Sequence, residues 1–183
     1  MKLIKFFLLI LLSFNISVKA NSNDEIQSLL KEGKKLIFIR HAIAPGGGDP
    51  LDFDILKCET QRNLSIEGIE QSKNIGKFFS ENNIKIDKVL SSEWCRCKQT
   101  AQHAFDKYET KSFLNSFFSA KFASNKNKQI NDLKKYINEW SGDNNLVLVT
   151  HYVTIQEVLN VTSSSGELII TDRNFNVLAR QNF

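Results

Sequence analysis

The amino-acid sequence predicts an α/β fold with a mostly parallel central sheet and helices on both faces. Short apolar runs at residues 36–40, 85–90 and 146–149 alternate with longer segments whose apolar residues recur at helical spacing. Such alternation is typical of β–α–β units, in which helices bury parallel strands. We find no internal repeat or low-complexity linker, so residues 21–183 are expected to form one domain.

A short helix precedes the first predicted strand. Residues 24–32 have helical spacing and end at Gly33, a residue type that commonly terminates helices. The strand at 36–40 leads into residues 42–56, which hold both prolines and three of the eight glycines. This irregular segment either brings backbone N–H groups close to an anion or is a flexible surface loop.

A longer helix and a second strand are predicted after this loop. Ser65 is placed as the N-cap of the helix, and Asn82-Asn83 ends it. The apolar residues that recur at helical spacing are Ile66, Ile69, Ile75, Phe78 and Phe79. Residues 85–90 have the composition of a strand.

A third helix is predicted from Glu93 to about residue 107, capped by Ser91 or Ser92. Arg96 falls in its first turn. A strand-to-helix junction directs free backbone N–H groups, and here a guanidinium, toward the carboxyl edge of the sheet, where an anion is favoured. His103, two turns further on, is expected to be structural.

The rest of the chain adds one helix–strand unit and a closing hairpin. The predicted elements are, in order, a short strand or irregular segment at 113–118, a helix at 124–140, a strand at 146–149, a helix at 154–159 and a hairpin of 167–170 with 176–180. The hairpin is expected to add antiparallel edge strands to the sheet.

Residues suited to phosphate chemistry stand at the ends of two predicted strands. Arg40-His41 directly follows the first apolar run, and Thr150-His151 follows the run at 146–149. Carboxyl ends of parallel strands meet at one sheet edge, so these side chains are expected to converge. An imidazole can attack phosphorus and a guanidinium can hold its oxygens. The alternative is a set of unrelated polar residues at strand ends.

Residues 1–20 have the pattern of a signal peptide. A basic start, an apolar stretch at 6–12 and the ending Val18-Lys19-Ala20 match what a signal peptidase reads. Polar residues at 13, 15 and 17 make the segment short for a membrane span, which leaves an uncleaved anchor as the alternative. We therefore expect an exported, periplasmic protein with no stable membrane insertion after cleavage.

The net charge gives no reason to expect a nucleic-acid partner. The formal charge is +4, and Lys2, Lys5 and Lys19 in the signal segment supply three of these charges. The lysines between residues 121 and 135 are interspersed with Asn and Gln, as on a solvated helix face. The oligomeric state stays open.

Three cysteines leave one thiol unpaired after any single bridge. Cys95 and Cys97 are two residues apart and badly placed to bridge each other, so a disulfide between Cys58 and one of them is the preferred pairing. The alternatives are three buried thiols or, with little support from the spacing, a zinc site.

Four motifs follow one another in a characteristic order. They are Phe38-Ile39-Arg40-His41-Ala42, Asn63-Leu64-Ser65-x-x-Gly68, Leu90-Ser91-Ser92-x-x-x-Arg96-x-x-Gln99-Thr100-Ala101 and Val149-Thr150-His151. Together they span most of the chain after residue 20 and resemble the motifs of the histidine phosphatase superfamily, also called phosphoglycerate-mutase-like. The resemblance implies a three-layer α/β/α sandwich.

The same resemblance implies that His41 is a nucleophile phosphorylated during turnover, and that Arg40, Arg96 and His151 hold the phosphoryl oxygens. Water would hydrolyse the phosphohistidine, with no metal or other cofactor. The expected substrate is a small-molecule or envelope-linked phosphomonoester, or alternatively phosphohistidine. A non-catalytic phosphate-binding relative is the other alternative. Arg62 is either a substrate-binding residue at the site rim or a surface ion-pair partner.

The sequence departs from the better-known members at the proton donor. Ala42 replaces the glycine of the Arg-His-Gly signature, residues 113–117 lack the Glu of the mutase branch, and Tyr152-Val153 lacks the acidic residue of the acid-phosphatase branch. Glu93 and Asp49 are the leading candidates for the missing acid.

Overall fold

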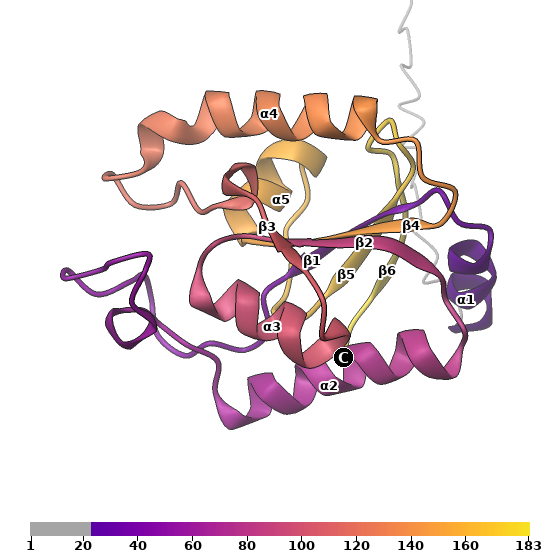
Figure 1. Cartoon of the computed structure of the whole chain (residues 1–183), viewed down its shortest axis with the longest axis horizontal. Coiled ribbons are helices and arrows are strands. Elements are labelled where there is room, and N and C mark those ends of the chain that lie inside the picture. The colour runs from indigo at the N-terminus through magenta and orange to yellow at the C-terminus, as the bar shows by residue number, and fades with distance from the viewer. Residues whose placement is uncertain (1–22) are drawn as a thin grey trace, which may run out of the picture.

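A six-stranded sheet forms the middle layer of the structure, a computed structural model that describes residues 23–183 (Figure 1). Its strands are β1 (Leu36–Arg40), β2 (Ile86–Ser91), β3 (Glu109–Thr110), β4 (Asn145–Thr150), β5 (Leu168–Thr171) and β6 (Val177–Gln181). They lie in the order β3-β2-β4-β1-β5-β6, parallel from β3 to β1 and antiparallel at β5 and β6. The predicted parallel sheet with an antiparallel hairpin at its edge is confirmed.

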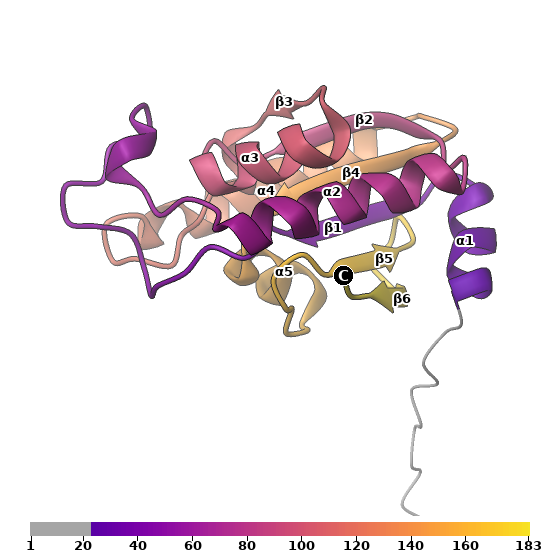
Figure 2. The same cartoon turned by 90° about the horizontal axis from the view of Figure 1, so that it is seen from below.

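Helices cover both faces of this sheet. α2 (Ile66–Glu81) and α3 (Cys95–Phe105) lie on one face, and α4 (Lys126–Glu139) and α5 (Tyr152–Leu159) lie on the other (Figures 1 and 2). α1 (Asn23–Lys31) packs at the end of the sheet where β1 begins. The predicted three-layer α/β/α sandwich is therefore confirmed.

Strand β1 shows how the layers are held together. Ile37 and Ile39 belong to the apolar cluster shared with α2 and α3, whereas Leu36 and Phe38 belong to the cluster shared with α4 and α5. All four side chains are fully buried. Because both faces of the strand are covered, its sequence is a continuous apolar run and shows no alternation.

The start of α2 is held against the segment that follows His41. Ser65 caps the helix as predicted, its Oγ accepting a hydrogen bond from the N–H of Gly68 at 3.1 Å. A Cβ at Gly68 would collide with the carbonyl oxygen of Ile43. The glycine of the second motif therefore permits a close approach of helix and loop beside the predicted site.

The predicted start of α3 at Glu93 is wrong by two residues, since the helix begins at Cys95. Two side chains distant in sequence satisfy N–H groups at this end. Asn115 Oδ1 accepts from the N–H of Glu93 at 2.9 Å, and Gln61 Oε1 accepts from the N–H of Cys95 at 2.9 Å. Such long-range capping has no local sequence signal.

The segment between α3 and α4 also differs from the prediction. β3 is absent from the predicted elements, because it is two residues long and both are exposed. Residues 113–118 form no strand, so the alternative prediction of an irregular apolar segment is confirmed there; a 3-10 turn spans Ser112–Leu114. Leu114 is fully buried, and its carbonyl accepts from Thr150 Oγ1 at 2.7 Å. This segment is apolar because it packs under α4 at the end of β4.

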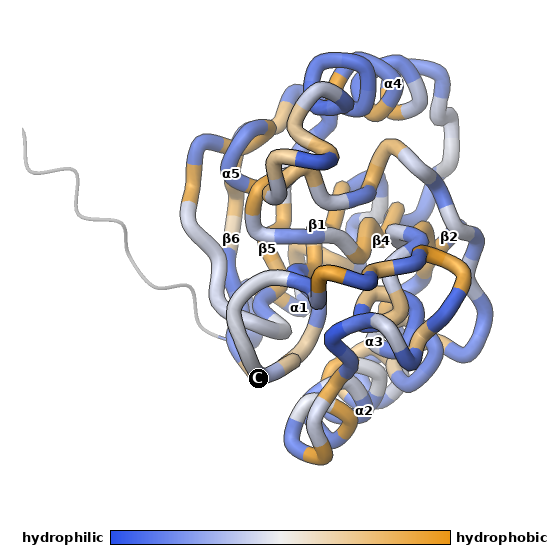
Figure 3. The backbone as a smooth tube through the Cα atoms, turned by 90° about the vertical axis from the view of Figure 1, so that its left-hand side faces the viewer, coloured by the Kyte–Doolittle hydropathy of each residue, from blue (hydrophilic) through white to orange (hydrophobic). Residues whose placement is uncertain are grey.

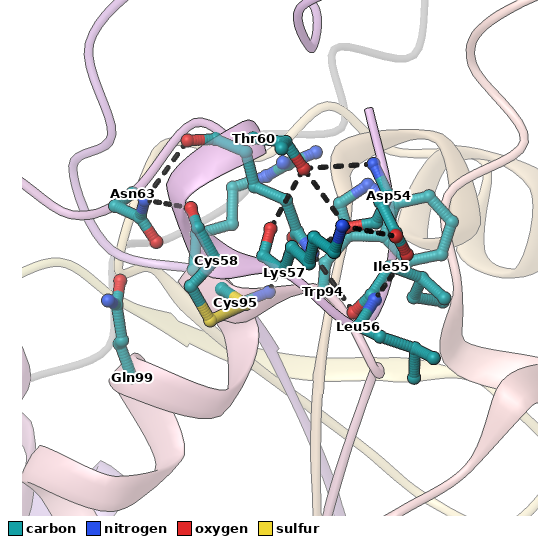
Figure 4. The surroundings of a disulfide bond; sticks show 12 residues. Asp54, Ile55, Leu56, Lys57, Cys58, Thr60, Asn63, Trp94, Cys95 and Gln99 are labelled. Carbon is teal, nitrogen blue, oxygen red and sulfur yellow. Dashed lines mark hydrogen bonds and ion pairs between the residues drawn. A yellow bond between two sulfur atoms is a disulfide. The ribbon is translucent and has the colours of Figure 1, made fainter. Parts of the chain in front are cut away.

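A disulfide joins Cys58 to Cys95, and Cys97 is a buried free thiol (Figure 4). The predicted pairing is confirmed, and the alternative of three free thiols is wrong. Figure 4 shows the loop residues around Cys58 gathered over the start of α3, with Asn63 Nδ2 donating to the Cys58 carbonyl at 2.7 Å. The bridge therefore fastens the loop after β1 to the helix that carries Arg96.

The predicted signal peptide at residues 1–20 lies outside the described residues. Within residues 23–183, no helix is both long and apolar enough to cross a membrane. In the same range, His, Cys, Asp and Glu side chains form no group of three or more that could hold a metal ion. The alternative zinc site is wrong for Cys58 and Cys95, because these residues are bridged to each other.

Candidate active site

A cavity of about 370 Å³ opens where β1 and β4 end. The loop after β1 and the segment before α4 bound it, and both project from the same end of the molecule in Figures 1 and 2. Figure 3 faces this end, with the sheet between α4 and α2. The predicted site residues that line the cavity are Arg40, His41, Asp49, Arg62, Arg96 and His151.

The ring of His41 is fixed in one tautomer. Its backbone N–H donates to the Thr150 carbonyl at 2.9 Å, which holds the end of β1 against β4. Its Nδ1 lies 2.9 Å from the carbonyl oxygen of Ala42. A carbonyl oxygen only accepts, so Nδ1 must carry the proton. The lone pair of His41 is therefore on Nε2, which makes no hydrogen bond to any described residue.

His41 is also held in its neutral form. Burial, and next the positive charge of Arg96, lower its pKa to about 3. The side chain is 3% exposed. A neutral imidazole with a free Nε2 lone pair is the form that can attack an electrophile.

His151 follows β4 and directly precedes α5. Its ring meets the His41 ring edge-on, with the centroids 5.5 Å apart. Nδ1 lies 3.4 Å from Arg96 Nη2, and Nε2 lies 2.9 Å from Ser92 Oγ. Burial, then Arg96, holds the pKa of His151 well below the usual value. The structure brings together the two strand-end histidines as predicted.

Three arginines give the cavity a strong positive charge. Among the described residues, the Nε atoms of Arg40, Arg62 and Arg96 are buried and have no hydrogen-bond partner. Burial, and then the neighbouring Arg96, lower the pKa of Arg62. Holding three guanidiniums side by side away from water is costly, and a phosphate-like anion in the cavity would offset their charge. The cavity is therefore built to receive an anion.

Only one of the two candidate proton donors lies in the cavity. The Asp49 carboxylate pairs with Arg96, at 2.6 Å from Nη1 and 3.3 Å from Nη2, and accepts from Trp94 Nε1 at 3.0 Å. Glu93 does not line the cavity, and its carboxylate accepts from Asn115 Nδ2 at 2.6 Å. This placement favours Asp49 over Glu93 as the acid.

Sequence reasoning missed the aromatic residues of the cavity wall. Trp94, Phe118, Phe122 and Tyr152 all line it. The Trp94 ring packs edge-on against Phe122 and His151, with centroids 5.4 and 5.5 Å apart. Apolar rings in a sequence usually indicate core packing, so only the fold shows that these surround the site.

Comparison with known proteins finds matches among solved structures. No protein-family model matches the chain, and no curated protein does. The protein histidine phosphatase SixA, solved with tungstate, is 16% identical, with 81% of this chain and 96% of that chain covered and a TM-score of 0.57. Phosphoglycerate mutase from Thermus thermophilus is 14% identical, with 81% of this chain and 99% of that chain covered and a TM-score of 0.58. At these identities the comparison shows the fold alone, which is the phosphoglycerate-mutase-like fold.

The two buried histidines are expected to make the protein sensitive to mild acid. Their pKa values in the folded protein lie below 6.5, so below pH 6.5 the unfolded chain binds protons that the folded protein does not. The free energy of unfolding should therefore fall between pH 7 and pH 5, by about 2 kcal/mol from His41 alone, with a further loss from His151. Urea unfolding at the two pH values measures this loss.

Single substitutions assign the loss to the buried rings. His151→Gln should reduce the pH-dependent difference, because it removes one of the two buried rings. Equal stability of the wild-type protein at pH 7 and pH 5 would contradict the burial of neutral histidines.

Proposed function

We propose that this protein is an exported phosphatase that hydrolyses phosphomonoesters through a phosphohistidine formed on His41. The observation that carries the proposal is the state of the His41 ring. Its hydrogen bond to the Ala42 carbonyl keeps the proton on Nδ1, which leaves the Nε2 lone pair free in a cavity lined by three arginines. A neutral nucleophile surrounded by fixed positive charge suits attack on a phosphoryl group.

In the first step, His41 Nε2 forms a bond to phosphorus as the bond from phosphorus to the leaving oxygen breaks. The leaving oxygen departs with the bonding electrons and takes a proton from an acid. Arg40, Arg62 and Arg96 neutralise the charge on the phosphoryl oxygens. The position of Arg62 in the cavity lining supports substrate binding over a surface ion pair.

In the second step, a water oxygen attacks phosphorus and the electrons of the phosphorus–nitrogen bond return to Nε2. The proton lost by the water passes to a carboxylate or to solvent, and phosphate leaves. His41 is thereby restored for another turnover. No step in this sequence uses a cofactor.

Asp49 is the residue that we assign as the acid. It is the candidate carboxylate that lies in the cavity, and it sits on Arg96, one of the expected phosphate ligands. An incoming phosphoryl group competes with Asp49 for this guanidinium. Once displaced from Arg96, the carboxylate can take up a proton from solvent and pass it to the leaving oxygen, which restores the carboxylate.

Two features support export. Residues 1–20 have the pattern of a signal peptide. The bridge between Cys58 and Cys95 is of a kind that persists in oxidising compartments such as the periplasm. Small or envelope-linked phosphomonoesters are therefore the proposed substrates, and nucleic acid is not a proposed partner.

Hydrolysis of phosphohistidine is a second candidate function. The aromatic wall formed by Trp94, Phe122 and Tyr152 favours a planar leaving group, and imidazole is one. A solved structure of similar fold is of a protein histidine phosphatase. Imidazole needs less help from an acid than an alkyl oxygen does, because it is the better leaving group.

A phosphate-release assay tests both candidates. Protein comprising residues 21–183 should release phosphate from an aryl phosphate, an alkyl phosphate or a phosphohistidine peptide, and the fastest of the three identifies the leaving-group class. Chelation of metal ions should leave the rate unchanged. Binding of inorganic phosphate without release from any of the three would instead favour the non-catalytic relative.

A further inference from the structure

A chain of polar side chains runs from His151 away from the cavity. His151 Nε2 lies 2.9 Å from Ser92 Oγ, and Ser92 Oγ lies 3.0 Å from Asn115 Oδ1. Asn115 Nδ2 lies 2.6 Å from a carboxylate oxygen of Glu93. His151, Ser92 and Asn115 are buried and Glu93 is half-buried, so water does not compete freely for these contacts. This series of hydrogen bonds ends at Glu93, the candidate acid that does not line the cavity.

The direction of each hydrogen bond in this chain is determined. The Glu93 carboxylate only accepts, so the Asn115 group that faces it is the NH₂. The Glu93 backbone N–H donates to the other end of the same amide, which is therefore its oxygen. That oxygen also only accepts, so the Ser92 hydroxyl must give it its single hydrogen.

Ser92 can then offer His151 only a lone pair. The N–H of Trp94 also donates to Ser92 Oγ, at 3.2 Å, as expected for an oxygen whose own hydrogen points elsewhere. Cys97 Sγ, 3.5 Å from His151 Nε2, donates its weak hydrogen bond to the Thr150 carbonyl. Nε2 of His151 therefore carries a proton, and in the neutral ring Nδ1 is a lone pair.

This tautomer is the opposite of that of His41, and it places a lone pair where an anion bound to Arg96 would lie. In the ligand-free protein, Nδ1 of His151 accepts a long hydrogen bond, 3.4 Å, from Arg96 Nη2, which can only donate. A phosphate dianion bound to Arg96 would meet the Nδ1 lone pair and be repelled, unless Nδ1 takes up a proton. Once protonated, the ring donates to the anion through Nδ1 and to Ser92 through Nε2.

We propose that Glu93, Asn115 and Ser92 are positioning residues that keep the proton of His151 on Nε2, so that a phosphate dianion binds together with one added proton on Nδ1. The negative charge of Glu93 stabilises the resulting imidazolium through the hydrogen bonds of Asn115 and Ser92. This inference deepens the proposed function, on which it rests. The other titratable or charged groups around the His151 ring are Arg40, His41, Asp49, Arg62, Arg96, Cys97 and Tyr152.

Nitrogen NMR of the ligand-free protein tests the tautomer. With three histidines in the chain, His103→Gln and His41→Ala assign the ring signals. In the wild-type protein, His151 should carry its proton on Nε2 and His41 on Nδ1. Ser92→Ala removes the partner of Nε2 and leaves the tautomer to the long contact of Nδ1 with Arg96 Nη2, so the His151 proton should be divided between the nitrogens. Glu93→Gln, which still offers an oxygen to Asn115, should keep the proton on Nε2.

Calorimetry with inorganic phosphate tests the proton uptake. Titrations at pH 8 in two buffers of different ionisation enthalpy should show that the wild-type protein takes up about one more proton per phosphate than Ser92→Ala does, because any uptake by Asp49 is common to both. A wild-type His151 protonated on Nδ1, phosphate binding without uptake, or wild-type behaviour of Ser92→Ala in both measurements would overturn the proposal. The tautomer is measured in the ligand-free protein and does not depend on catalysis. A protein that released no phosphate from any substrate would therefore contradict the proposed function but would not change the result of the tautomer measurement.

Discussion

His41→Ala is expected to lower phosphate release by at least about 10³-fold on every substrate, because it removes the atom that attacks phosphorus. The side chain lies at the end of β1, in contact with the cavity and outside the two apolar clusters. The fold should therefore survive the substitution. Phosphate release by the purified variant, measured beside its circular dichroism spectrum and melting temperature, checks both expectations.

The wild-type protein supplies the complementary observation. A reaction stopped in alkaline denaturant, where phosphohistidine survives, should carry phosphate on His41 and on no other residue. His103→Gln is the matched control, because His103 is the exposed histidine on α3 and should be dispensable. Activity of His41→Ala within tenfold of the wild type would exclude the covalent route.

The sequence predicted the parts of this site that depend on strand ends. Arg40, His41 and His151 follow strands buried on both faces, and such strands are recognisable as continuous apolar runs. Parallel topology then brings their carboxyl ends to one edge, so convergence could be inferred without coordinates. The pairing of Cys58 with Cys95 or Cys97 followed from elimination.

The parts that depend on long-range contacts could not be predicted. The amide of Asn115 caps the start of α3 and also orients Ser92, but it comes from a segment that looked like a short strand. The choice between Asp49 and Glu93 as proton donor could not be predicted for the same reason. Both are acids near a motif in the sequence, and only the packing of the glycine-containing loop against Arg96 separates them.

The contact between Asp49 and Arg96 allows two roles for this acid. As a proton donor, Asp49 would leave the guanidinium when the phosphoryl group arrives and then protonate the leaving oxygen. As an internal competitor, it would only occupy the anion site until substrate displaces it. Both roles predict that phosphate and Asp49 exclude each other at Arg96, so binding alone does not separate them.

The two roles differ in how the rate depends on the leaving group. If Asp49 is the donor, Asp49→Asn should slow hydrolysis of alkyl phosphates by about 10² to 10⁴, because a poor leaving oxygen needs its proton. Aryl phosphates should be affected far less. If Asp49 is only a competitor, the variant should bind phosphate more tightly and hydrolyse both classes at least as fast. Steady-state rates on one alkyl and one aryl phosphate decide between these outcomes.

Two matched variants complete this experiment. Asp52→Asn changes an exposed carboxylate of the same loop and should leave both rates unchanged. Glu93→Gln tests the other acid, and its position behind Asn115 and Ser92 predicts a similar loss on alkyl and aryl phosphates, because it acts through His151 on phosphate binding. A loss confined to alkyl phosphates in Glu93→Gln, with none in Asp49→Asn, would reverse the assignment of the proton donor.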